Sequence, residues 1–193
     1  YGVDALRYYL MADIATGRDS DFSEERLITR YNGDLANSLG NLLNRTLNMA
    51  HRYRAGVVRQ SGGDSPLRGQ AEAAIAAFHQ QLGVYQVHAA IDALNGFVTA
   101  CNGYVETTAP WKLAKDPERA ETLDHVLHAL AEATRIIALL LSPILPKAAG
   151  AIFEQLNWKG EMTFAATAWG GLPDNHSLGK PTPLFPRIEA PAS

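Results

Sequence analysis

The stretch SEERLITRYNGDLANSLGNLLNRTLNMAHRYRAG, from Ser23 to Gly56, predicts one long amphipathic helix. Ser23 is a suitable N-cap, and the two glutamates that follow it would lie beside the positive end of the helix dipole. At 100° of rotation per residue, a set of apolar side chains falls within one stripe about 80° wide. These side chains are Ile28, Tyr31, Leu35, Leu39, Leu42, Met49 and Tyr53. We therefore expect this stripe to face a helical core.

The opposite side of the same helix carries mostly amide and guanidinium side chains, namely Asn37, Asn41, Asn44, Arg45, Asn48 and Arg52. Each asparagine costs roughly 0.6 kcal/mol relative to alanine in a helix interior, so propensity alone does not explain them. No Asp or Glu occurs from Leu35 to Gly63, although the chain has 20 acidic residues among 193. A surface without carboxylates suits a polyanionic partner. A solvated face without further function is the alternative at this point.

The remaining pattern predicts an all-α fold, an antiparallel bundle of about five helices with an irregular Pro- and Gly-rich C-terminal tail. Further helices are expected from Pro66, from about Val84 to Thr107, from Asp116 to Leu141, and from Pro143 to about Trp158. No run of 18 apolar residues is present, so we expect no membrane span. The lone Cys101 excludes an internal disulfide, which together with the missing signal peptide favours a cytoplasmic protein.

Two features of the polar side chains indicate nucleotide binding. Asn41 and Arg45 are four residues apart, so both can reach the same ligand, and their side chains suit base edges and phosphates. Trp111 follows Ala-Pro at a predicted helix end, where an indole on a short turn could stack on an unpaired base. For Trp111 the alternative is a ring that only caps the core.

No catalytic or metal site is expected in the chain. His125 and His128 have helical spacing, but no third ligand accompanies them. Glu132 with His128 is a weak indication of a ligand-binding helical bundle. The sequence has no Gly-rich phosphate loop and no serine with a visible activating partner.

Five segments carry a family resemblance: YGVDALRYYLM, GRDSDFSEERLITRYNGDLANSLGNLLNR, NGYVETTAPWKLAK, LLSPILPKAAGAIFEQL and PLFPRIE. In this order and spacing the chain resembles the carboxy-terminal portion of bacterial methionyl-tRNA synthetases. The resemblance implies a helical bundle that reads the CAU anticodon of methionine tRNA. The family reads the anticodon with an Asn and an Arg on the first bundle helix and a Trp after Ala-Pro, which correspond to Asn41, Arg45 and Trp111.

We expect Asn48, Arg52 and Arg54 to make weaker contacts with phosphate or sugar. The family's two ATP-handling signatures, His-Ile-Gly-His and Lys-Met-Ser-Lys-Ser, do not occur in the sequence. The resemblance therefore implies that ATP, with Mg²⁺, binds only in a catalytic domain upstream, and that this chain alone is inactive and binds no cofactor.

The resemblance also implies a division of the chain. Residues 1–22 would connect it to the upstream catalytic domain, residues 23–157 would form the bundle, and residues 158–193 would pack back on it. No further module follows Ser193, which favours a monomer. The alternative function is a protein-interaction module of a synthetase-like paralogue, which would expose an apolar patch of several hundred Å².

Overall fold

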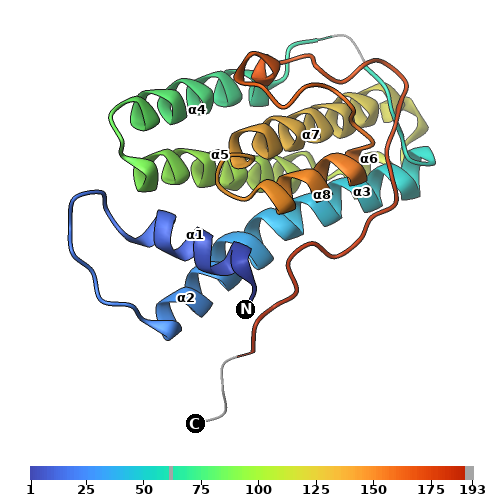
Figure 1. The fold of residues 1–193 in the computed structure, drawn as a ribbon. Coiled ribbons are helices and arrows are strands. Elements are labelled where there is room, and N and C mark those ends of the chain that lie inside the picture. Colours follow the sequence, from blue (N-terminus) through green and yellow to red (C-terminus); the bar gives the residue numbers. More distant parts are fainter. Residues whose placement is uncertain (61–62, 190–193) are drawn as a thin grey trace.

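The chain folds as a helical bundle in the computed structural model, which describes residues 1–60 and 63–189 (Figure 1). The helical elements are α1 (Val3–Asp13), α2 (Glu24–Arg30), η1 (Tyr31–Gly40), α3 (Asn41–Arg54), α4 (Pro66–Gly83), α5 (Val87–Thr108), α6 (Pro110–Leu113), η2 (Pro117–Arg119), α7 (Ala120–Leu141), α8 (Pro146–Leu156) and η3 (Phe164–Thr167). Two short strands, β1 (Val57–Val58) and β2 (His176–Ser177), form one antiparallel pair. The predicted all-α class is confirmed.

α2, η1 and α3 form one continuous helical path along the side of the bundle (Figure 1). Ser23 caps its start, since its hydroxyl accepts a hydrogen bond from the Arg26 N–H at 3.2 Å. The expectation of a regular α-helix was wrong in the middle, where the ten residues of η1 are π-helical. Gly40 suits the end of this π-helical segment, because a Cβ there would lie only 3.0 Å from the Leu35 carbonyl oxygen.

α7 is the centre of the bundle and packs against α3, α4, α5 and α8. From Val126 to Leu141 every one of its side chains is buried. In Figure 1 it lies among these helices, with the tail crossing above it. An apolar helix of this kind is stable in a globular protein only when other elements surround it. Among the described residues, no helix combines the length and apolar character needed to cross a bilayer.

A buried ion pair joins the tail to α7. Arg135 donates to both carboxylate oxygens of Glu132, at 2.9 and 2.6 Å, and both side chains are fully buried. Arg135 also donates to the carbonyls of Ala166 and Ala168, while Glu132 accepts from the backbone N–H groups of residues 170–172. The pair thus provides hydrogen-bond partners for backbone groups in η3 and in the irregular segment that follows it.

The Glu132 carboxylate is ionised in this site. Burial by itself raises its pKa, but the hydrogen bonds and charge of Arg135, with the N–H groups of Gly171 and Gly170, lower the pKa below its ordinary value. Both carboxylate oxygens of Glu132 accept hydrogen bonds from protein groups. The weak indication of a ligand-binding bundle at Glu132 and His128 has its explanation in this structural ion pair.

The first 22 residues share the core of the bundle. Tyr8 and Tyr9 of α1 are buried, and the Tyr8 hydroxyl donates to Asp34 at 2.9 Å and accepts from Asn95 at 2.8 Å. α1 packs chiefly on α5 and α2. Residues 158–189 return over the bundle, and residues 190–193 of the predicted tail lie outside the described residues.

Gly56 ends the long helical path in a conformation that other residues rarely adopt, with φ of 79°. A Cβ there would lie 2.6 Å from Cε1 of His51, whose ring is hydrogen-bonded to the Gly179 carbonyl. We expect Gly56→Ala to lower the free energy of unfolding by about 1–3 kcal/mol, measured by urea denaturation. Gly96→Ala is the matched control: Gly96 is an exposed site inside α5 with nothing near its Cβ position, so alanine should add about 0.5–1 kcal/mol there. Equal effects of the two changes would contradict this account.

Candidate nucleic-acid interface

The predicted asparagine face is open to solvent. Asn37, Asn41, Asn44 and Asn48 are all exposed, while the leucines on the other side of the same helical path are buried. π-helical turns are rare and occur often at functional sites, and here η1 ends where this polar face is densest. The surface is therefore accessible to a ligand as large as a nucleic acid.

Arg45 and Trp111 are brought together although they are distant in sequence. The Arg45 Cζ lies over the Trp111 ring, 5.6 Å from its centroid, in a cation–π contact. The Arg45 guanidinium also donates to Glu106 at 2.6 Å, and its side chain remains 27% exposed. The arginine is thus held in one orientation by an aromatic face and a carboxylate.

The short turn after α5 positions Trp111. Ala109 has a left-handed conformation, with φ 45° and ψ 64°, and ends α5; Pro110 then opens α6. The ring of Trp111 is half-buried and packs against the core on one side. The indole thus caps the core, as the alternative interpretation expected, and also contacts Arg45, whereas stacking on a base stays a prediction.

A polar groove of about 470 Å³ lies between the long helical path and α5. It is lined by Gly33, Asn37, Ser38, Asn41, Arg45, Thr99, Asn102, Gly103 and Glu106. Asn102 donates to the carbonyls of Ser38 and Val98, at 3.2 Å each, whereas its Oδ1 is buried without a protein partner. Amide donors, amide acceptors, a guanidinium and a carboxylate thus line one hollow, which suits the edges of a nucleobase.

The three weaker candidates differ in their surroundings. Arg52 is exposed, and its guanidinium lies 5.7 Å from the Tyr53 ring centroid. Asn48 is exposed and donates to Asn44. Arg54 instead pairs with Asp124 and donates to the Ala120 carbonyl, so its guanidinium connects α3 to the start of α7. For Arg54 the structure favours a structural role over the predicted RNA contact.

Sequence reasoning missed Glu106 and Asn102, which belong to the groove but lie on α5. Both lie in the last two turns of α5, four residues apart. That spacing is a usable signal, since i and i+4 positions share a face. The sequence alone could not show that this face of α5 lies beside Asn41, because the two segments are distant in sequence.

Among the described residues, no group of three or more His, Cys, Asp or Glu side chains could hold a metal ion. His128 is buried, and burial lowers its pKa, so the ring is held neutral inside the protein.

Two family models match the chain. One, described as "tRNA synthetases class I (M)", matches residues 1–47, and the other, "Anticodon binding domain of methionyl tRNA ligase", matches residues 58–192. The methionine–tRNA ligase of Bacillus subtilis is 41% identical in an alignment of 198 positions that covers 98% of this chain and 30% of that protein. The Enterococcus faecalis ligase is 40% identical, over 98% of this chain and 29% of its own length.

Two solved structures that are similar in fold belong to the same family as these relatives. The apo methionyl-tRNA synthetase of Mycobacterium tuberculosis superposes with a TM-score of 0.92 at 32% identity, over 98% of this chain and 40% of that one. Its complex with methionyl-adenylate gives a TM-score of 0.86 at 31% identity, over 96% of this chain and 38% of that one. The chain thus spans well under half the length of these relatives. With the second family model covering most of the sequence, the chain belongs to the methionine–tRNA ligase family, as its anticodon-binding portion.

Proposed function

We propose that this chain reads the CAU anticodon of methionine tRNA within a ligase that uses ATP to attach methionine to that tRNA. The observation that carries the proposal is the contact of Arg45 with Trp111, beside Asn41, at an open groove. Glu106 is the one acidic residue in the lining of this groove. Trp111 would stack on one unpaired base, while Asn41 and Arg45 would bond to base edges. Asn48 and Arg52 would contact phosphate or sugar.

In this proposal the chain acts on catalysis only through placement. Seating the anticodon orients the tRNA so that its distant 3′ end enters an active site in the upstream domain. Residues 1–22 connect to that domain, residues 23–157 form the reader, and residues 158–193 brace it. ATP, with Mg²⁺, belongs to the upstream domain, and the enzyme works as a cytoplasmic monomer.

The test is binding of the 193-residue chain to anticodon stem-loops, followed by fluorescence anisotropy. A CAU loop should bind more tightly than loops with altered anticodon bases, at micromolar affinity or weaker, and binding should weaken as salt rises. Arg45→Ala should abolish most of the discrimination between loops while the circular dichroism spectrum is unchanged. Equal binding of every loop by the unsubstituted chain would refute anticodon reading.

Glu106 competes with RNA for the Arg45 guanidinium. Exposed ion pairs are worth about 0.2–1 kcal/mol, and Glu106 is 61% exposed, so Glu106→Gln should raise RNA affinity about 1.5-fold to fivefold at low salt. The same titration measures this change. Glu72→Gln, which removes an equally exposed carboxylate paired with Arg68 on α4, should have no such effect. A loss of affinity in Glu106→Gln would mean that the carboxylate helps to hold RNA.

The alternative of a protein-interaction module is not favoured by the comparisons. Exposed apolar side chains do gather on α1, where Val3, Leu6 and Leu10 are 64%, 44% and 43% exposed. They are on a different element from the asparagine face.

A further inference from the structure

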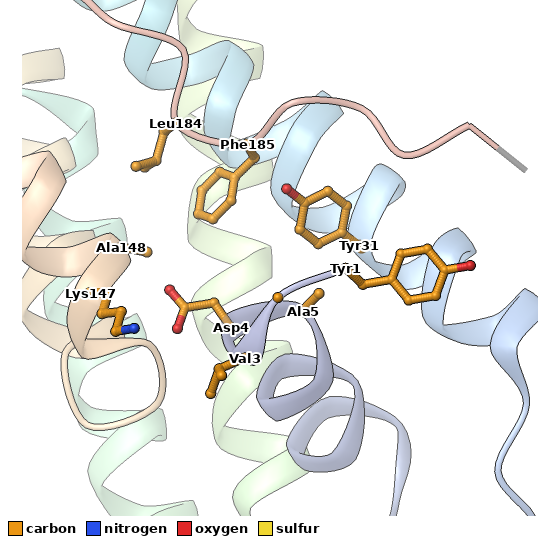
Figure 2. Close-up of a pocket in the computed structure, with 10 residues that line it drawn as sticks. Tyr1, Val3, Asp4, Ala5, Tyr31, Lys147, Ala148, Leu184 and Phe185 are labelled. Atoms are coloured by element: carbon orange, nitrogen blue, oxygen red, sulfur yellow. The ribbon is translucent and has the colours of Figure 1, made fainter.

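A hollow of about 330 Å³ lies where the first turn of α1 meets the start of α8 and the tail (Figure 2). Pockets for small molecules span about 300–1,000 Å³, so this hollow suits a ligand at the small end of that range. It shares no lining residue with the polar groove beside Arg45. The hollow is therefore separate from the surface proposed to bind RNA.

Two side chains of opposite charge line this hollow. Figure 2 shows Asp4 of α1 and Lys147 of α8 pointing toward one another across it. Within residues 1–60 and 63–189, neither of these two charged groups, nor the Tyr31 hydroxyl on the same lining, has a hydrogen-bond or ion-pair partner. Burial and the charge of Asp4 both raise the pKa of Tyr31, so its phenol lies near this carboxylate. A polar ligand could therefore bind these groups without displacing a protein contact.

Arg7 holds the two charged sides of the hollow at a fixed spacing. Its guanidinium donates to the carbonyl of Ile144 at 2.9 Å and to that of Pro143 at 3.4 Å, in the loop before α8. Asp4 lies three residues before Arg7 on α1, and Lys147 lies three residues after Ile144. The bridge therefore sets the gap between the carboxylate and the ammonium group, and the gap exists without a ligand.

The tail gives the hollow an apolar side. The Phe185 ring meets the Tyr31 ring edge to face, with centroids 6.1 Å apart, and Leu184 lines the hollow beside it. Asn32 fixes this part of the tail through two hydrogen bonds with the Ile188 backbone, donating at 2.8 Å and accepting at 2.9 Å. An apolar group that enters the hollow would therefore meet a surface that is already in place.

These features together define the chemistry of a ligand. A simple anion would be repelled by Asp4 and a simple cation by Lys147, whereas a molecule that carries both charges can pair with both side chains. An α-amino acid carries its ammonium and carboxylate groups on one carbon, which leaves its side chain to contact the apolar side. A polyanion such as RNA is disfavoured at this place, because Asp4 lies within the hollow.

We propose that this hollow binds a free α-amino acid with an apolar side chain. The ammonium group of the ligand pairs with Asp4, its carboxylate pairs with Lys147, and its side chain lies against Phe185 and Leu184. The Tyr31 hydroxyl accepts a further hydrogen bond from the ammonium group. Ion pairs of solvent-accessible side chains are weak and the ligand is small, so we expect a Kd of about 0.1–10 mM. This inference does not depend on the proposed function.

Saturation-transfer difference NMR with the 193-residue chain and L-leucine tests the inference. Leucine should bind saturably, and glycine, which has both charges but no side chain, should bind about fivefold more weakly or worse. Asp4→Asn and Lys147→Gln should each weaken leucine binding about twofold to fivefold. The matched controls are Asp92→Asn on α5 and Lys159→Gln just after α8, which remove exposed charges outside the hollow and should bind leucine normally.

Blocked forms of leucine show which charge each side chain binds. Leucine amide lacks the carboxylate, so its binding should depend on Asp4 and not on Lys147, and N-acetyl-leucine, which lacks the ammonium group, should show the reverse. The inference is overturned if leucine shows no saturable binding, if Asp4→Asn and Lys147→Gln bind leucine like the unsubstituted chain, or if the two blocked forms respond alike. None of these results bears on anticodon reading, which the stem-loop titration tests separately.

Discussion

Replacing Glu132 with alanine is expected to lower the free energy of unfolding by about 3–5 kcal/mol, which is a large part of the stability of a domain of this size. The variant would leave the Arg135 guanidinium fully buried without its counter-ion. It would also remove the acceptor for three backbone N–H groups at residues 170–172. A donor that is left buried without an acceptor adds a desolvation cost, and Leu172 is buried.

Urea denaturation followed by circular dichroism measures this effect. Glu72→Ala is the matched control, because Glu72 also pairs with an arginine at helical spacing but both partners are exposed. Its expected cost is at most about 1 kcal/mol. If Glu132→Ala costs no more than Glu72→Ala, the buried pair does not hold the tail to α7, and another contact must do so.

Trp111→Ala is expected to weaken binding of the CAU stem-loop by about 1–3 kcal/mol, or roughly fivefold to 150-fold, through loss of stacking. The change also removes the aromatic face on which the Arg45 guanidinium lies, so the arginine is left to Glu106 alone. Discrimination between anticodons should therefore fall together with affinity. Anisotropy titrations with CAU and altered loops report both quantities.

Tyr85→Asn is the control for exposed aromatic surface. Tyr85 is 78% exposed and lies just before α5, whereas Trp111 follows its other end, about 30 Å away for a helix of 22 residues. Asparagine suits the positive φ at this position. Normal binding by this variant together with weak binding by Trp111→Ala would place the stacking at the groove. Equal losses would indicate nonspecific adhesion of RNA to aromatic side chains.

The sequence was sufficient for the fold class and for one wall of the site. Apolar and polar side chains segregate with helical period from Ile28 to Tyr53, so the exposed asparagine face followed from local spacing alone. Trp111 could be singled out because Ala-Pro before it indicated a short turn. Local patterns of this kind require no knowledge of the tertiary packing.

Features that depend on contacts between distant segments were not predictable. The Arg54 side chain was expected to face RNA because its own neighbourhood lacks acids, but Asp124 reaches it from α7. Leu184 and Phe185 belong to a tail segment without periodicity. The position of this segment depends on Asn32 and Gly40 of η1, which are distant from it in sequence. The π-helical winding of η1 likewise has no signature in propensity.

The unbroken path from α2 through η1 to α3 has a mechanical consequence. Its first turns pack beside α1, and its last half carries the exposed asparagine face, so both ends belong to one rod about 45 Å long. A tilt of about 3° about one end displaces the other by about 2 Å over that length. Under the proposed function, a small rotation at the asparagine face would therefore be transmitted along the rod to the packing surface of α1.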